Sequence, residues 1–212
     1  MKHVPSSAFF NRNEALVDLS HRCPIECPKC QRQLYFTSRG KKVVGNDMPM
    51  TTIHKLTDRF EHLCFGGQLS DPIHHPKFIE ILDVCKKKNI GVKVQTASSF
   101  KPMSWYEEAF ETYPEAKWQF GIDGLPEQSS EYRINQDGVK LFEVMLMSKK
   151  YLKTQPIWQC IVFKYNQNNL EEVKNMAKEN GLKLVIMYSS RWDSGYDPYK
   201  PDVTKRLDHE RI

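Results

Sequence analysis

Short apolar runs rich in β-branched residues alternate with longer segments of helical period along most of this 212-residue chain. Six runs have the length and composition of strands, at residues 15–20, 63–67, 91–96, 117–123, 157–164 and 182–188. Five helical segments lie between them, at residues 51–63, 75–89, 104–113, 138–152 and 169–180. Strands that alternate with helices build βαβ units, so the sequence predicts an α/β fold with parallel strands.

Two parallel architectures accept this pattern, an open doubly wound sheet and a curved barrel. Neither a G-x-G-x-x-G motif nor a P-loop follows any predicted strand, so the main sequence support for a dinucleotide or ATP site is missing. Six units are also too few to close the eight-unit barrel. We therefore expect a partial (β/α)6 TIM-like barrel whose open side needs either a cover or a large substrate.

The expected barrel occupies residues 1–190, with about the first 13 residues as an extension, and residues 191–212 form a polar and aromatic tail over the body. No apolar run approaches the roughly 20 residues that span a bilayer. The start holds only a three-residue apolar stretch, too short for a signal peptide. We therefore expect a cytoplasmic protein without a membrane span. The net charge of +5 suits an acidic peptide or a nucleic acid but requires neither.

Three of the six cysteines lie within eight residues, directly after the first predicted strand. Cys23, Cys27 and Cys30 have the spacing C-x3-C-x2-C, in the loop position where a parallel barrel places its active site. Three thiolates in one short loop can bind three irons of a cubane cluster and leave the fourth iron open to a small molecule. The other three cysteines are predicted to be buried packing residues: Cys64, Cys85 and Cys160.

Two other interpretations of the cysteine loop remain. Cys23, Cys27, Cys30 and His21 could form a structural zinc site, because Cys3His is a normal zinc shell. Most zinc ribbons, however, use two separated pairs of ligands, and this chain has no second pair. The thiols could also be unliganded, but three exposed thiols in one loop would be prone to oxidation.

The cysteine spacing after the first strand of a six-unit α/β chain resembles the radical S-adenosylmethionine (radical SAM) superfamily, over about residues 14–190. The resemblance implies a [4Fe–4S] cluster on Cys23, Cys27 and Cys30, with S-adenosylmethionine (AdoMet) at the open iron. It implies an external one-electron donor of the flavodoxin or ferredoxin type. Reductive cleavage of AdoMet would then give a 5′-deoxyadenosyl radical that abstracts hydrogen from a substrate. Because no cysteine follows Cys160, we expect a small single-domain member without an auxiliary-cluster domain.

The same resemblance implies a set of AdoMet-binding residues. Gly66-Gly67-Gln68, after the second strand, is similar to the Gly-Gly-Glu segment that binds the amino group of the methionine moiety. Gln68 lacks the full charge of glutamate. Lys29 stands where the family often has an aromatic residue near adenine, and its alkyl stem can pack on a base. Thr96 ends the third strand, in a turn similar to the family's Thr-Asn-Gly.

Residues 120–133 resemble the family's fourth-strand segment, in which a strand-end polar residue and a downstream arginine approach the ribose and the carboxylate. These positions are Asp123 and Arg133. Without the resemblance, Asp123 could cap the following turn and Arg133 could lie on a solvated helix flank. Tyr188, at the end of the sixth strand, completes the residues expected at the cofactor.

The substrate is expected to be a peptide or protein side chain, because residues 159–166 and the following helix resemble the peptide-modifying branch and an open barrel admits a large molecule. One alternative is a tRNA or a nucleotide, which would suit the basic residues of 39–42 if Lys41 and Lys42 lie near the mouth. Another alternative is a zinc-binding module without enzymatic activity.

Overall fold

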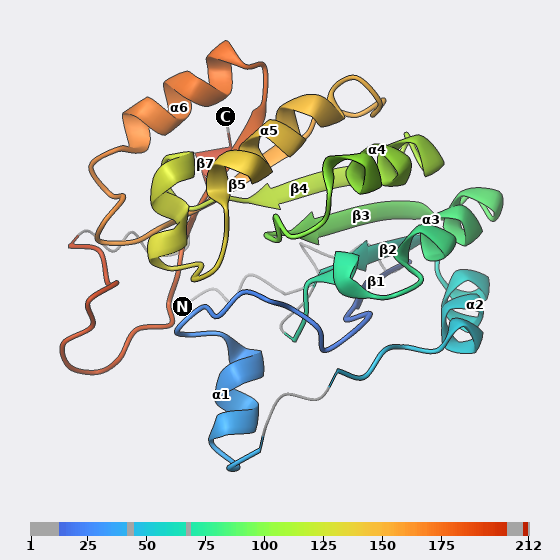
Figure 1. The fold of residues 1–212 in the computed structure, drawn as a ribbon, viewed down its shortest axis with the longest axis horizontal. Helices are drawn as coiled ribbons and strands as arrows, with labels where there is room; N and C mark the ends of the chain where they lie inside the picture. The colour runs from blue at the N-terminus through green and yellow to red at the C-terminus, as the bar shows by residue number, and fades with distance from the viewer. Residues whose placement is uncertain (1–12, 42–44, 67–68, 203–209, 212) are drawn as a thin grey trace.

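The computed structural model describes residues 13–41, 45–66, 69–202 and 210–211. Its centre is one open sheet in which six parallel strands follow one another in chain order (Figure 1). The strands are β1 (Glu14–Val17), β2 (His62–Phe65), β3 (Gly91–Thr96), β4 (Lys117–Gly121), β5 (Ile157–Val162) and β6 (Lys183–Tyr188). β1 lies at one edge of the sheet, and β7 (Glu210–Arg211) pairs antiparallel with β6 at the other. The predicted partial (β/α)6 barrel is therefore confirmed.

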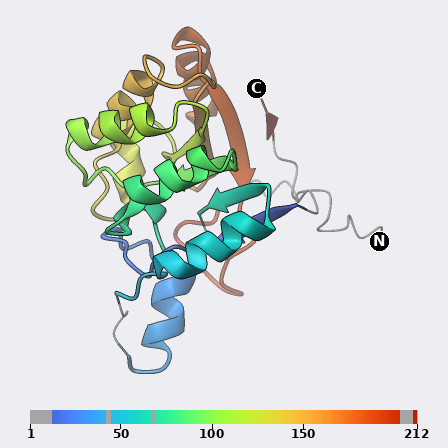
Figure 2. The same ribbon diagram turned by 90° about the vertical axis from the view of Figure 1, so that its right-hand side faces the viewer.

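The helices that connect the strands cover one face of the sheet (Figures 1 and 2). They are α2 (Met50–Arg59), α3 (Phe78–Lys87), α4 (Met103–Thr112), α5 (Gly138–Ser148) and α6 (Leu170–Glu179). Two 3-10 helices precede α3 and α5, η2 (Pro72–His74) and η3 (Pro126–Glu131). None of the helices that the structure describes is long and apolar enough to cross a bilayer.

Burial alternates along the strands, as expected when one face packs against helices. In β3, Val92 and Val94 are buried under the helices, whereas Lys93 and Gln95 point to the inner face of the sheet and keep some exposure. An aromatic cluster dominates the packed layer, with Trp118 and Phe120 of β4 stacked at a centroid distance of 6.0 Å. The hydrophobic core thus lies between sheet and helices, which leaves the inner face for a cavity.

Apart from the two 3-10 helices, two elements of the described chain were not predicted. α1 (Gln31–Thr37) begins directly after Cys30 and projects from the body (Figure 1). With seven residues, of which only Arg32 and Phe36 are buried, it has too short an apolar pattern to be recognised in the sequence. β7 consists of two residues whose position is set by pairing with β6, and a segment that short carries no periodic signal.

The tail begins beyond β6, and its described part, to residue 202, packs on the body. The Lys164 amide donates to the Tyr199 carbonyl at 2.9 Å. The Tyr199 ring meets Tyr132 edge to face, with centroids 5.2 Å apart, and the Trp192 ring approaches Phe163 at 5.9 Å. These contacts bring the tail to the carboxyl ends of the strands.

Candidate functional site

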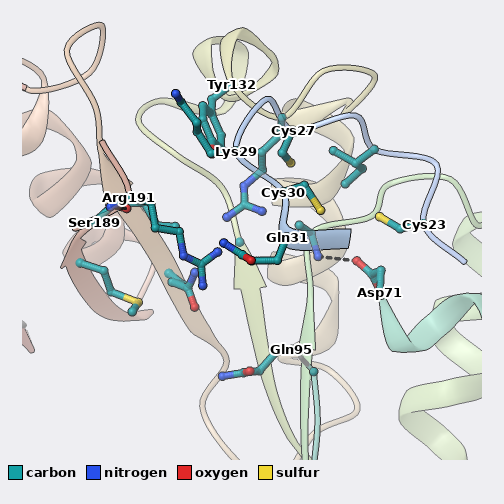
Figure 3. Close-up of a pocket in the computed structure, with 18 of the residues that line it drawn as sticks. Cys23, Cys27, Lys29, Cys30, Gln31, Asp71, Gln95, Tyr132, Ser189 and Arg191 are labelled. Carbon is teal, nitrogen blue, oxygen red and sulfur yellow. Dashed lines mark hydrogen bonds between the residues drawn. The ribbon is translucent and has the colours of Figure 1, made fainter. Parts of the chain in front are cut away.

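A cavity of about 550 Å³ lies where the carboxyl ends of the strands meet the cysteine loop (Figure 3). Parallel strands in register bring all their carboxyl ends to one edge, where the loops of a barrel build the active site. The predicted site residues that line this cavity come from three strand ends, the cysteine loop and the segment after η3: Cys23, Cys27, Lys29, Cys30, Gly66, Thr96, Arg133 and Tyr188. A volume of this size is typical of sites for small molecules and cofactors.

The cysteine loop is held on several sides. The Glu26 amide donates to the Ile134 carbonyl at 3.1 Å, and the Asp71 amide donates to the Arg22 carbonyl at 3.2 Å. Ile25, which is 2% exposed, anchors the loop between Cys23 and Cys27. The loop is thus fixed against the segments that follow β2 and β4, and its cysteines are presented to the cavity.

All three cysteines of the loop are free thiols and partly buried. Burial raises the pKa of the Cys23 thiol to about 12 and that of Cys27 to about 11. At neutral pH these two side chains are therefore protonated in the metal-free protein. A metal would have to displace the protons, as soft cations do when thiolates ligate them.

The arrangement fits a cluster better than a single ion. Nowhere in the described residues are three His, Cys, Asp or Glu side chains grouped as ligands of one ion. A zinc ion needs all its donors at about 2.0–2.3 Å from one atom, whereas a cubane cluster binds each thiolate through a different iron. The His21 ring packs edge to face on Phe36, 5.9 Å between centroids, and does not line the cavity. The donor set therefore suits a [4Fe–4S] cluster.

Gly66 permits a close approach between β2 and β3. A Cβ at this position would lie 2.5 Å from Cβ of Gln95, and the backbone φ of +156° is one that other residues rarely adopt. The glycine therefore opens the cavity wall at the end of β2. Gly67 and Gln68, predicted to bind AdoMet, lie outside the residues that the structure describes.

Asp123 and Arg133 form a buried ion pair beside the cavity. Nε of Arg133 lies 2.7 Å from Oδ2 of Asp123, and Nη2 donates to Oδ1 at 3.3 Å. Asp123 also accepts from the Ile161 amide at 2.8 Å and is fully buried. It does not line the cavity, so it is not placed to contact a ribose as the resemblance implied. Because its oxygens are engaged by Arg133 and the β5 backbone, its role in this structure is to position Arg133.

Arg133, by contrast, lines the cavity. Gly121 provides the space for it, because a Cβ there would lie 2.9 Å from Nη2. Asp123 engages Nε and Nη2, so Nη1 remains to bind an anion. The arginine is therefore not a solvated helix flank.

Lys29 links the cysteine loop to the tail. Its ammonium forms ion pairs with Asp193 and with Asp197, the latter at 3.2 Å. Asp197 is fixed in turn by the Asp193 and Tyr199 amides. The pKa of Asp197 is lowered: burial raises it, but these amides and Lys29 more than offset that effect. The ammonium of Lys29 is thus committed to the tail, and only its alkyl stem is left to face a ligand.

Two buried charged residues at the cavity, Asp71 and Arg32, were missed by sequence reasoning. Asp71 accepts from the Thr96 hydroxyl and from the amides of Ala97 and Ser98, at 2.8–3.0 Å, and so ties the end of β3 to the loop after β2. The Asp-Pro pair that starts η2 was its only signal. Arg32 is 6% exposed and donates only to the carbonyls of His21 and Ile25. Nothing in its sequence context indicates burial.

Of the two basic residues expected at the mouth, Lys41 is described, and it is not there. Lys41 follows the carboxyl end of α1, whereas Cys30 precedes the amino end of that helix, and Lys41 does not line the cavity. Lys42 lies outside the described residues. The described part of the loop that suggested a nucleic acid, residues 39–41, does not line this site.

Comparison with known proteins gives the fold. No protein-family model matches the chain, and no curated protein matches its sequence. Streptococcus suis SuiB bound to S-adenosylmethionine superposes with a TM-score of 0.67 at 14% identity, over 90% of this chain and 44% of SuiB. Native anSMEcpe with bound AdoMet gives 0.65 at 19% identity, over 88% of this chain and 55% of anSMEcpe. Methylornithine synthase (PylB) gives 0.61 at 12% identity, over 82% and 52%. These proteins are radical SAM enzymes.

The chain has the radical SAM fold. The resemblance drawn from the cysteine motif is thereby confirmed at the level of the fold. The chain spans about half the length of these enzymes. AdoMet is bound in two of these three structures.

Proposed function

We propose that this chain is a radical SAM enzyme that binds a [4Fe–4S] cluster through Cys23, Cys27 and Cys30 and acts on a peptide or protein side chain. One observation carries the proposal: the three free thiols line the same cavity as the carboxyl ends of the parallel strands. When bound, the cluster and AdoMet supply the reductive cleavage of the sulfonium to methionine and a 5′-deoxyadenosyl radical. The electron comes from an external one-electron donor.

The residues of the chain hold and orient what enters the cavity. Arg133, positioned by Asp123, offers Nη1 to a carboxylate. Tyr132 and Phe163, whose rings stack with centroids 4.1 Å apart, give the cavity an aromatic wall near Lys29. Gly66 and Thr96 line the cavity with small residues at the ends of β2 and β3. Together with the tail, these groups limit the access of water.

A peptide substrate has support from two neighbours. SuiB has been crystallised with its precursor peptide SuiA, and anSMEcpe with the Kp18Cys peptide. The nucleic-acid alternative has less support, because Lys41 does not line the cavity. We therefore favour the peptide.

The decisive experiment is anaerobic reconstitution with iron and sulfide, followed by reduction with dithionite in the presence of AdoMet. We expect a brown protein with about four irons per chain and the formation of 5′-deoxyadenosine with an equal amount of methionine. A colourless protein that retains zinc and forms no 5′-deoxyadenosine would refute the proposal and support the zinc module.

Arg32 is expected to make the cluster easier to reduce. Its guanidinium is buried at the cavity, two residues after Cys30, and no carboxylate lies within 4 Å of it in the described part of the chain. A unit charge about 10 Å away, at an effective dielectric constant of about 20, is worth roughly 1.7 kcal/mol. In Arg32→Gln we expect the equilibrium constant for one-electron reduction to fall about tenfold, or about 59 mV.

An EPR-monitored redox titration checks this prediction. The reduction potential of Arg32→Lys should stay close to that of the wild type, because the charge is kept. Arg22→Gln is the matched control, since Arg22 lies on the same loop but is exposed and paired with Asp47. Equal potentials in Arg32→Gln and Arg22→Gln would remove Arg32 from the electrostatics of the cluster.

A further inference from the structure

Three glutamine side chains stand on neighbouring strands at the inner face of the sheet: Gln95 of β3, Gln119 of β4 and Gln159 of β5, here called the carboxamide row. All three line the cavity. Gln95 and Gln119 are partners in the strand register, and Nε2 of Gln119 donates to Oε1 of Gln159. Figure 3 shows Gln95 at the far end of the pocket from the three thiols.

Amides at these positions need an explanation, because the interior of a parallel barrel is normally filled by bulky branched apolar residues. A buried amide that lacks a hydrogen-bond partner destabilises the folded protein. Gln119 is only 6% exposed. Its hydrogen bond to Gln159 uses the amide nitrogen of Gln119 and the amide oxygen of Gln159, and leaves the oxygen of Gln119 and the nitrogen of Gln159 available. Within the described residues, the Gln95 side chain makes no hydrogen bond. The row therefore keeps donors and acceptors that the protein itself does not use.

The surroundings of the row indicate the charge of its ligand. Four cationic residues line the cavity, and none of them lies on a strand. Lys29 is in the cysteine loop, Arg32 in α1, Arg133 after η3 and Arg191 in the tail. The one acidic residue of the lining, Asp71, is engaged by the end of β3. The other cavity-lining strand residues beside the row are uncharged, among them Gly121, Ile161 and Met187. A ligand on the row is therefore neutral and both donates and accepts hydrogen bonds.

Peptide groups have this chemistry, and the dimensions agree with an extended chain. Adjacent strands lie about 4.8 Å apart, so three strands span roughly 10 Å, the length of about three extended residues. A nucleobase would also match a carboxamide, but its recognition relies on stacking against a ring. The rings of the lining belong to Tyr132, Phe163 and Tyr188, which lie at strand ends and in loops, not in the row.

We propose that the carboxamide row binds the backbone of an extended peptide substrate at the inner face of the sheet. The proposal rests on the proposed function, which supplies the peptide, and it adds the residues that hold the peptide groups. The carboxamide row would bind the peptide backbone, and the reacting side chain would be selected closer to the three thiols.

The test uses the cluster-loaded protein with AdoMet and a defined probe, acetyl-trialanine N-methylamide, with binding measured by saturation-transfer NMR titration. A second probe replaces the central peptide group by an ester, which removes one N–H donor. We expect the wild type to bind the amide roughly threefold to tenfold more tightly than the ester. Gln95→Leu and Gln119→Leu should weaken binding of the amide, and at least one of them should abolish the difference between the probes.

Gln155→Leu is the matched control, because Gln155 is exposed at the opposite end of β5 and donates to the Gly181 carbonyl. Iron content is measured in every sample. If the variants keep their iron and still distinguish the amide from the ester, the row is not a subsite for the peptide backbone. Tighter binding of adenosine or guanosine than of the amide probe would contradict the proposal as well. Gln95→Glu, which keeps the shape, replaces any leucine variant that fails to fold. A wild type without iron would instead refute the proposed function.

Discussion

Cys23→Ala, Cys27→Ala and Cys30→Ala are each expected to reduce iron from about four atoms per chain to less than one. Each thiol faces the cavity from a loop that is held on several sides, so no other side chain can readily replace the one removed. With two thiolates left, a cubane cluster is insufficiently held. Iron and sulfide analysis after anaerobic reconstitution measures the effect.

Two controls make the result specific. Cys85→Ala removes a buried thiol of α3 that does not line the cavity, and iron loading should be unchanged. His21→Ala distinguishes the cluster from a Cys3His zinc site, since only the zinc site needs the imidazole. Full iron loading in the variant that lacks all three loop cysteines would refute the assignment.

Asp123→Ala is expected to lower the free energy of unfolding by about 3–5 kcal/mol, because it leaves the Arg133 charge buried without its partner. The substitution also removes the acceptor of the Ile161 amide in β5. Urea denaturation, with the slope checked for two-state behaviour, measures the loss. The double variant Asp123→Leu/Arg133→Met should recover much of it, since an apolar pair removes both buried charges.

An exposed ion pair provides the comparison. Asp83 and Lys87 lie one turn apart on α3 with 40% and 72% of their side chains exposed. Asp83→Ala should cost no more than about 0.5 kcal/mol, as exposed pairs of this spacing do. If Asp123→Ala proved as mild as Asp83→Ala, the Asp123–Arg133 pair would not be the support of the cavity wall that the geometry indicates.

The alternation of apolar runs and helical periods was enough to predict the six strands, the five connecting helices and the open barrel. In each of those elements the buried side chains recur at the regular spacing of a helix or a strand, and that spacing can be recognised in the sequence. α1 was missed because its apolar pattern is too short, and β7 because its position is set by pairing with β6. The cysteine loop was found because its spacing is local, and the fold then placed it at the strand ends.

The finer features of the site depend on which residues meet across the sheet. Asp123 has the sequence position of a ligand-binding residue, but Arg133 and the Ile161 amide occupy its carboxylate. Asp71 looks like a helix cap, yet it also fixes the end of β3. The carboxamide row could not be recognised from the sequence, because three glutamines on three strands become neighbours only through the register.

The ion pairs of Lys29 join parts of the chain that are made at different times. Lys29 and Asp193 are 164 residues apart. At about 5–20 residues per second, a ribosome needs roughly 10 to 30 seconds to extend the chain from one to the other. During that interval the nascent cysteine loop lacks both carboxylate anchors of the tail, so it is more accessible to iron donors than in the finished protein. Asp193 and Asp197 therefore close the loop only after the six parallel strands have been made, and delivery of the metal has a natural window before these two residues emerge.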